Sequence, residues 1–218
     1  MEPKYRNGYP INMRRIVLTS SNYKVCIGAA CIIQAIYLYG VYHTGIHIGW
    51  NLCGMAYCTF LEYIYHRFLL HYAEDHPIHY YLHGKHHLKP FSPSIHVPVL
   101  YTYLLNLGAY YLTSLISPIA SMNIMVMYQF CYIIFEHIHM EAHHPQFLIG
   151  HDSFRISHLY HHMKNKHLAY AFSTPTWDIV FGTFPHEVLT YNWFALCPIP
   201  LLSYSWGTTP QTSTISSS

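Results

Sequence analysis

Charged residues are missing from two long stretches of this chain, and both stretches are largely apolar. No Lys, Arg, Asp or Glu occurs from Val25 through Leu61 or from Pro90 through Phe135. One helical pass through a bilayer needs about 17–25 residues, so each stretch is long enough for two passes. Natural breaks fall at residues 42–45 and at Ser117-Pro118. We therefore predict four membrane helices, near residues 25–42, 46–64, 98–116 and 120–138.

The positive charges lie on one side of these four helices. Four passes place both termini and residues 62–89 on the same side, and all eleven Lys and Arg fall there. The positive-inside rule makes this side cytosolic, and we expect the membrane to be the endoplasmic reticulum. Three segments follow: a cytosolic N-terminal segment, 1–24, a membrane domain, 25–206, and a Ser/Thr-rich tail, 207–218, that we expect to be disordered.

Composition narrows the class of protein. Only 9% of the residues are charged, against about 25% in typical soluble domains, although a soluble helical protein remains the alternative. A net charge of +2 offers no basic stripe for nucleic acid. The six cysteines form no CxxC pair, and five lie in the predicted helices. They therefore do not indicate a disulfide framework. The sequence predicts an all-α integral membrane protein.

Histidine is the most unusual feature of the composition. The chain has twenty, and ten of them form four tight clusters just outside the charge-free stretches. Neutral imidazole is the commonest side-chain metal ligand, and ten are more than one ion can use. The sequence therefore predicts a two-metal site in a cytosolic cap above the four helices. The predicted ligands are His66, His71, His83, His86, His87, His139, His143, His158, His161 and His162.

Helical spacing explains most of these clusters. In each HxxHH motif the three histidines span an arc of about 100° on one helix face. His139 and His143 are four residues apart, so they can bind one ion together. His66 and His71 are five apart, about 140° around a straight helix. Either the helix unwinds there, or the two serve different ions.

The other polar groups near the clusters have less specific roles. Glu62, Glu136 and Glu141 are candidates for hydrogen-bond acceptors that orient the ligands. His43 and His47 are expected at the opposite, luminal end of the helices. Seven further histidines are interpreted as surface residues or as partners of the ligands: His76, His79, His137, His144, His151, His167 and His186. His96 falls in the second charge-free stretch.

The ligand type alone leaves the metal open among zinc, copper, iron and nickel. No cysteine joins the clusters, which argues against a zinc finger, and no GxSxG or Walker motif is present. An all-nitrogen dimetal site at a membrane surface favours redox chemistry on a lipid. The sequence identifies no separate general base, and no catalytic residue is predicted beyond the metal ligands.

Four segments resemble one family. These are EYIYHRFLLH, HGKHHLKPF, HMEAHH and HLYHHMKNKHLAYAFSTPTWDIVFGTF, which together are similar to the membrane fatty acid 2-hydroxylases of the sterol desaturase and fatty acid hydroxylase superfamily. The resemblance runs from about Glu62 to Phe184. HxxxxH followed by HGxHH, and the ending Thr176–Thr183, resemble the 2-hydroxylases more than the sterol enzymes.

The resemblance implies a four-helix anchor, two metal ions on the ten histidines above, and O2-dependent hydroxylation at carbon 2 of long acyl chains of sphingolipids or ceramides. It implies iron as the functional metal, with zinc able to occupy the site. Electrons would come from NAD(P)H through a reductase and cytochrome b5. Many relatives carry a fused cytochrome b5 domain, and only about two dozen residues precede the first predicted helix here. We therefore expect a separate donor.

The chain departs from its relatives after HGKHH. Relatives have an acidic residue and Arg-Leu-Val before the prolines, whereas this chain reads PFSPSIHVP over residues 90–98, a change that bears on acyl-chain or headgroup selection. Three alternatives remain: a sterol desaturase or sterol methyl oxidase, a membrane metal transporter or storage protein, and a metal-stabilised scaffold without activity. A transporter would need ionisable residues inside the helices, and the charge-free stretches hold no Asp or Glu.

Overall fold

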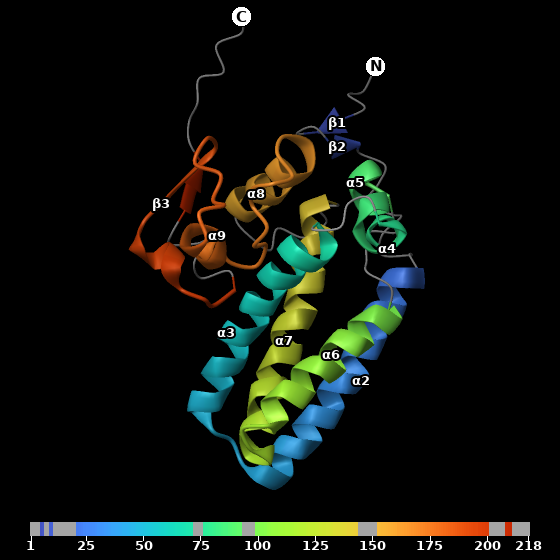
Figure 1. Ribbon diagram of the computed structural model, residues 1–218, viewed down its shortest axis with the longest axis vertical. Coiled ribbons are helices and arrows are strands. Elements are labelled where there is room, and N and C mark those ends of the chain that lie inside the picture. Colours follow the sequence, from blue (N-terminus) through green and yellow to red (C-terminus); the bar gives the residue numbers. More distant parts are fainter. Residues whose placement is uncertain are drawn as a thin grey trace, which may run out of the picture.

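Four helices form an elongated bundle in the computed structural model, which describes residues 5–6, 9–10, 21–71, 76–92, 99–143, 152–200 and 208–210. The helices are α2 (Ser21–Thr44), α3 (Ile48–Ile64), α6 (Val99–Ser114) and α7 (Pro118–His143). They run side by side, and both connecting turns lie at the same end of the bundle (Figure 1). The predicted helices near 25–42, 46–64, 98–116 and 120–138 are thus each found, within a few residues.

Two of the four helices are long and apolar enough to cross a membrane by themselves. They cover Lys24–Thr44 and Pro118–His143. The other two are shorter, with 17 residues in α3 and 16 in α6. Length and composition therefore identify two candidate spans among the described residues, where the sequence predicted four.

The bundle is closely packed along α3 and α7. Gly54 of α3 lies against the backbone of Ile124 of α7, and a Cβ at this position would collide with the Ile124 carbonyl. Small residues permit this kind of close approach between membrane helices. The apolar core beside it includes Ile33, Cys58 and Met125. Outward-facing side chains are also apolar, among them Ile32, Ile36, Leu100, Leu104 and Leu107, which are all more than half exposed.

Buried polar side chains connect helices within the bundle. The Tyr37 hydroxyl donates to the side-chain oxygen of Asn106 at 2.9 Å, and the side-chain NH2 of Asn106 donates to the side-chain oxygen of Gln129. Gln129 donates in turn to the backbone oxygen of Ala30 at 3.2 Å. This series joins α2, α6 and α7. Hydrogen bonds of this kind are favoured in apolar surroundings because an unpaired polar group there is costly.

A second polar contact fixes the turn between α2 and α3. Asn123 of α7 donates to the Gly45 oxygen at 3.0 Å and accepts from the His47 amide at 2.8 Å. Gly45 has φ +86°, a backbone conformation that glycine adopts without strain. The turn of residues 45–47 is therefore held by a side chain from another helix.

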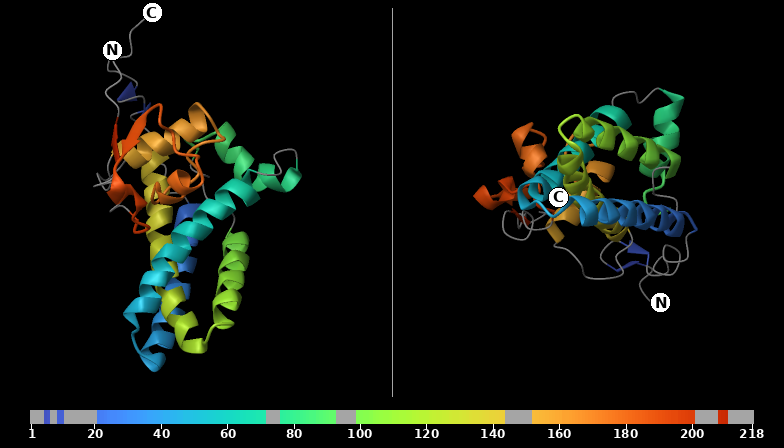
Figure 2. Two further views of the ribbon diagram at one scale, coloured as in Figure 1. Left: turned by 60° about the vertical axis from the view of Figure 1, so that its left-hand side comes forward. Right: turned by 90° about the horizontal axis from the view of Figure 1, so that it is seen from below.

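A cap of short helices covers the other end of the bundle (Figure 2). Its elements are the π-helices η2 (Tyr65–Leu70) and η3 (Tyr80–Gly84), the α-helices α4 (Pro77–His79), α5 (Lys85–Leu88), α8 (Asp152–Met163) and α9 (Thr176–Val180), and the 3-10 helix η4 (Trp193–Leu196). Because η2 continues directly from α3, and α7 ends at His143, the long helices extend into the cap.

The prediction of an all-α fold needs a small correction. Strand β1 (Tyr5–Arg6) pairs with β2 (Tyr9–Pro10), and β3 (Leu189–Tyr191) pairs with β4 (Thr208–Pro210), both antiparallel. Strand β4 lies in the segment 207–218, which the sequence predicted to be disordered. The rest of that segment lies outside the described residues, as do residues 93–98 of the segment that departs from relatives.

Candidate metal centre

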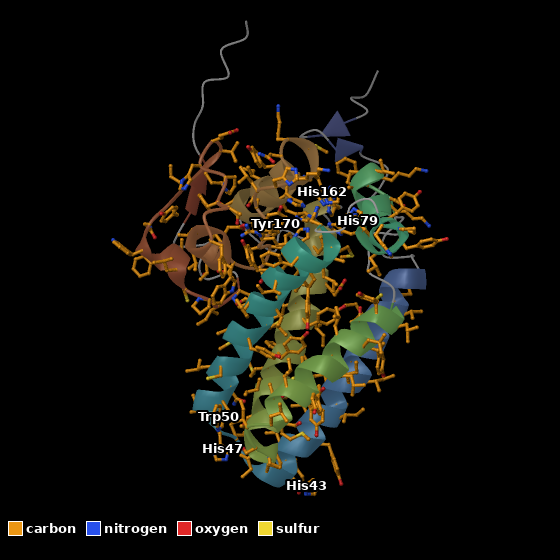
Figure 3. The ribbon with its side chains drawn as sticks, in the orientation of Figure 1. His43, His47, Trp50, His79, His162 and Tyr170 are labelled. Carbon is orange, nitrogen blue, oxygen red and sulfur yellow. The ribbon has the colours of Figure 1, made fainter. Side chains whose placement is uncertain are left out.

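The ten predicted ligands come together in two groups of five. In each group the potential ligand atoms all lie within 4.8 Å of one another. The first histidine group is His66, His71, His83, His87 and His161. The second histidine group is His86, His139, His143, His158 and His162. Eight of the ten side chains are buried, and only His87 and His162 are half-buried. His162 lies in the cap at the upper end of the bundle (Figure 3).

A π-helix resolves the five-residue spacing of His66 and His71. Both belong to the first histidine group, and their Nε2 atoms are 3.2 Å apart. The chain between them forms η2, in which hydrogen bonds run from residue i to i+5 and bring such residues to the same side. The first of the two explanations offered by the sequence is therefore correct: the regular helix is distorted here.

In each HxxHH motif the first and third histidines belong to one group and the second histidine belongs to the other. His83 and His87, four residues apart, belong to the first group, and His86 between them belongs to the second. In α8 the relation is reversed. His158 and His162 belong to the second group, and His161 belongs to the first. Each motif thus links the two groups, so that the two sites are built as one unit.

The nitrogen positions fit the coordination shell of a metal ion. In the first group, Nε2–Nε2 distances are 3.0 Å for His66–His83, 2.9 Å for His87–His83 and 3.1 Å for His161–His71. In the second they are 2.8–3.1 Å. Ligands at right angles with metal–nitrogen bonds of about 2.1 Å are about 3.0 Å apart. The arrangement therefore matches five nitrogens around each ion.

Hydrogen bonding between the rings does not explain the same distances. His66 and His161 donate from Nδ1 to backbone oxygens, at 2.6 Å to Tyr170 and 2.7 Å to Leu168. In the neutral ring the single proton is then on Nδ1, so each Nε2 atom carries a lone pair and no proton. Both face Nε2 of His71, which carries at most one proton. Several lone pairs converging in a buried space call for a cation at their centre.

Burial keeps these imidazoles neutral, as metal binding requires. Desolvation lowers the pKa of His66 to about 4, although its hydrogen bond to Tyr170 acts in the opposite direction. Desolvation, followed by the neighbouring charges of His66 and His79, lowers the pKa of His87 to about 3. Both rings are therefore unprotonated at neutral pH.

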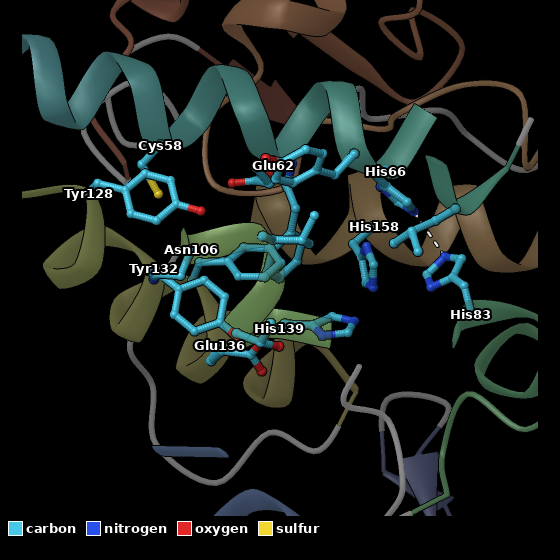
Figure 4. A pocket seen from close by; sticks show the side chains of 16 residues that line it. Cys58, Glu62, His66, His83, Asn106, Tyr128, Tyr132, Glu136, His139 and His158 are labelled. Carbon is cyan, nitrogen blue, oxygen red and sulfur yellow. Dashed lines mark hydrogen bonds between the residues drawn. The ribbon is translucent and has the colours of Figure 1, made fainter. Parts of the chain in front are cut away.

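A cavity reaches the two histidine groups from inside the bundle. It holds about 110 Å³ and is lined by residues of α3, α6, α7 and the cap. His66 and His83 of the first group and His139 and His158 of the second line one end. Cys58 and Tyr128 line the other end (Figure 4). Most of the remaining wall is apolar or aromatic, including Leu105 and Phe135.

The three glutamates differ in what they contact. Glu62 accepts hydrogen bonds from the backbone amides of Phe172 and Ser173 rather than from a ligand. Glu136 accepts from the Tyr132 hydroxyl at 2.6 Å, and both residues line the cavity. Glu141 is buried in α7. Glu62 thus acts on the segment that contains Tyr170, which the sequence singled out only as part of the family resemblance.

The other histidines lie away from the two groups or at their edge. His43 and His47 are exposed at the far end of the bundle (Figure 3), as expected. His76, His167 and His186 are exposed, and His137 is half-buried. His79 is half-buried, with its ring 5.9 Å from that of His71. His96, His144 and His151 lie outside the described residues.

Comparison with known proteins agrees with this arrangement. The family model for fatty acid hydroxylases matches residues 51–183, which include all ten histidines. The chain belongs to the fatty acid hydroxylase family. The match begins in α3 and ends just after α9, so it includes every residue that lines the cavity and all helices of the cap except η4.

Curated members of the family are similar at low identity. A mouse fatty acid 2-hydroxylase is 26% identical over 63% of this chain and 40% of its own length. A dihydroceramide fatty acyl 2-hydroxylase of Arabidopsis thaliana is 31% identical over 61% of this chain and 59% of its own. A ceramide very long chain fatty acid hydroxylase, scs7, of Schizosaccharomyces pombe is 28% identical over 63% and 43%. The chain thus spans about 40–59% of these relatives.

One solved structure has a similar fold. The hydroxylase domain of scs7p matches with a TM-score of 0.65 and 24% identity, over 77% of this chain and 68% of that one. At this identity the match supports the fold of the bundle and cap.

Proposed function

We propose that this protein is a membrane-bound, O2-dependent hydroxylase that acts at carbon 2 of long-chain fatty acyl groups, as part of sphingolipid synthesis. The observation that carries the proposal is the placement of two five-histidine groups at one end of a largely apolar cavity. The names of the relatives, fatty acid and dihydroceramide fatty acyl 2-hydroxylases, point to the same reaction.

The proposal places all four helices in the bilayer, with the cap on the cytosolic side of the endoplasmic reticulum. Apolar side chains cover the outer surface of α2 and α6, which suits contact with lipid. The described Lys and Arg lie at the cap end, and the turns at the other end contain none, in keeping with the positive-inside rule.

The ten histidines would hold two ions, one in each group. The nitrogen set suits iron, the expected functional metal, and zinc is accommodated by the same ligands. Bound iron would supply the reduction of O2 that hydroxylation of an unactivated C–H bond requires. One oxygen atom becomes the new hydroxyl group and the other leaves as water, with two electrons and two protons consumed. A separate cytochrome b5 and its NAD(P)H-dependent reductase are the proposed electron source.

The cavity would bind the acyl chain. Its aromatic and aliphatic wall excludes water from the reacting carbon, and His66, His83, His139 and His158 line the end where that carbon would lie. No separate general base is required in this scheme. The histidines hold and orient the ions, and the wall positions the C–H bond.

Expression in a yeast strain that lacks its own acyl 2-hydroxylase tests the proposal. Mass spectrometry of sphingolipids should show 2-hydroxy acyl chains with the wild-type protein and none with His161→Ala. A change in the sterols without any 2-hydroxy acyl chains would indicate a sterol desaturase or sterol methyl oxidase instead. If the wild-type protein is present in the cells and their lipids are the same as without it, the proposal of an acyl hydroxylase is refuted.

A further inference from the structure

The segment Leu168–Thr174, which we name the strap, contacts both histidine groups but in different ways. Its backbone oxygens at Leu168 and Tyr170 accept Nδ1 hydrogen bonds from His161 and His66, at 2.7 Å and 2.6 Å. Both rings belong to the first histidine group. The strap contacts the second group through the Phe172 ring, 4.5 Å from the ring of His158 and 5.3 Å from that of His139.

Asp178 of α9 holds the strap in place. Its two carboxylate oxygens accept hydrogen bonds from the backbone amides of Tyr170 and Ala171, at 2.9 Å and 2.8 Å. A third bond comes from the Thr183 hydroxyl at 2.6 Å. Asp178 is only 1% exposed, so water does not compete strongly with these contacts. The carboxylate therefore fixes the peptide groups on both sides of the Tyr170 Cα, and the second of these contains the Tyr170 carbonyl.

The backbone of the strap needs such anchoring. Ala169 has φ +58°, a conformation that costs a residue with a Cβ free energy and persists only where surrounding contacts enforce it. Its amide donates to the Thr183 oxygen at 2.8 Å. Glu62 holds the far side of the strap through the amides of Phe172 and Ser173. The strap is thus clamped between α3 and α9.

The second histidine group has less support of this kind. Among the described residues, no hydrogen-bond acceptor is found for Nδ1 of His86, His158 or His162. A hydrogen bond from the distal nitrogen fixes the tautomer and orientation of a ligating histidine and raises its basicity, and the loss of such partners typically lowers metal affinity about 10–100-fold. The strap thus orients His66 and His161 of the first group, whereas three ligands of the second group have no such acceptor among the described residues.

We propose that the strap makes the two metal sites unequal, with the first histidine group binding its ion more tightly than the second. Asp178 is the positioning residue for that first site, because it orients the Tyr170 carbonyl that holds His66. The inference rests on the proposed dimetal function, and it concerns the affinity of each site rather than the reaction.

The experiment measures metal affinity site by site. His143→Ala disables the second group and His83→Ala disables the first, so each variant retains one ion. Chelator titration of the purified, iron-loaded or zinc-loaded proteins, followed by elemental analysis, gives the affinity of each site. We expect the first site to release its ion at a chelator concentration about 10-fold or more above that of the second.

Asp178→Asn is then combined with each single-site background. The substitution places an amide NH2 against a backbone N–H donor, so we expect about a 10–100-fold loss of affinity in the first site and little change in the second. Thr113→Val is the matched control, because it removes buried hydrogen bonds to Ser121 and Ala109 far from the cap. It should leave both affinities unchanged.

Equal affinities of the two sites, or an equal effect of Asp178→Asn on both, would overturn the inference. Thr183→Val removes one bond to Asp178 and serves as the milder variant if Asp178→Asn does not fold. Its effect should also be confined to the first site. If the affinities are equal but the protein still makes 2-hydroxy lipids, only the inference of unequal sites is refuted. A wild-type protein that binds no metal would refute the proposed function itself.

Discussion

His86 and His87 are neighbours in the sequence, yet their imidazoles belong to different histidine groups. Their ring centroids are 6.1 Å apart and their planes are 64° apart. His87 lies beside His83 and His71 in the first group, and His86 lies beside His139 in the second. The α5 helix between α4 and the bundle thus supplies ligands to both sites through consecutive residues.

Substitution of either histidine should therefore remove a different ion. We expect His86→Ala and His87→Ala each to reduce bound metal from two ions to about one, and both to abolish hydroxylation, because the proposed reaction uses both ions. Elemental analysis of purified protein and lipid mass spectrometry measure the two effects. His167→Ala, at an exposed site, is the control. Retention of two ions in either variant would contradict the assignment of ligands.

The cavity should be required for the reaction but not for metal binding. Leu105→Trp would fill the cavity from α6, and we expect it to abolish 2-hydroxy products while bound metal stays at two ions. Leu104→Trp is the matched control, since Leu104 is 56% exposed on the outer surface of the same helix. Wild-type product levels with Leu105→Trp would exclude this cavity as the acyl site.

The contact of Gly54 with α7 should dominate the stability of the bundle. Gly54→Ala places a Cβ against the Ile124 carbonyl and 3.0 Å from the Met127 Cβ. We expect it to lower the free energy of unfolding by about 3 kcal/mol, the upper range for overpacking.

Gly49→Ala provides the comparison within the same helix. A Cβ at Gly49 meets nothing within 4 Å, and alanine has the higher helix propensity, so a gain of about 0.5–1 kcal/mol is expected. Thermal unfolding in detergent measures both variants. A Gly54→Ala protein as stable as the wild type would contradict the close approach of α3 and α7.

Acid should destabilise the metal-free protein over a defined range of pH. The pKa of His66 is lowered from 6.5 to about 4, so the unfolded chain takes up a proton below pH 6.5 and the folded chain does not. The folded state therefore loses stability as the pH falls from 6.5 to about 4. His66 alone accounts for roughly 3 kcal/mol, at about 1.4 kcal/mol for each pH unit.

Thermal unfolding of the metal-free protein across this range checks the expectation. Little contribution from His66 is expected between pH 7 and 8, where the ring is neutral in both states. His66→Gln should reduce the slope between pH 6.5 and 4, because glutamine does not titrate. A slope that does not change in this variant would contradict the buried, neutral state of His66.

The sequence was most informative where a pattern extends over many residues. The charge-free stretches 25–61 and 90–135 predicted α2, α3, α6 and α7, because an apolar stretch of this length can hold two membrane helices. Histidine spacing predicted the convergence of ten imidazoles from distant segments. The link from His139 to His143 followed directly from the period of a regular helix.

The features that the sequence did not predict depend on local helix distortion and on backbone groups. The π-helix of residues 65–70 changes the direction of His71, and no side chain in YHRFLL indicates this distortion. Division of each HxxHH motif between two groups depends on where other helices lie, which spacing alone does not specify. The roles of the Leu168 and Tyr170 carbonyls could not be predicted, because every residue has a carbonyl. Asp178 was noticed only as part of the TWDIVFGT ending.

His87 and His162 would give the proposed metal centre a second approach. They are the half-buried members of the two groups, and their rings lie 4.2 Å apart. The cavity wall contains neither of them. A reductant arriving from the aqueous side would therefore meet one imidazole from each site at a single place. Electron delivery and lipid loading would then not compete for the same path, and a bound acyl chain need not leave before the centre is reduced again.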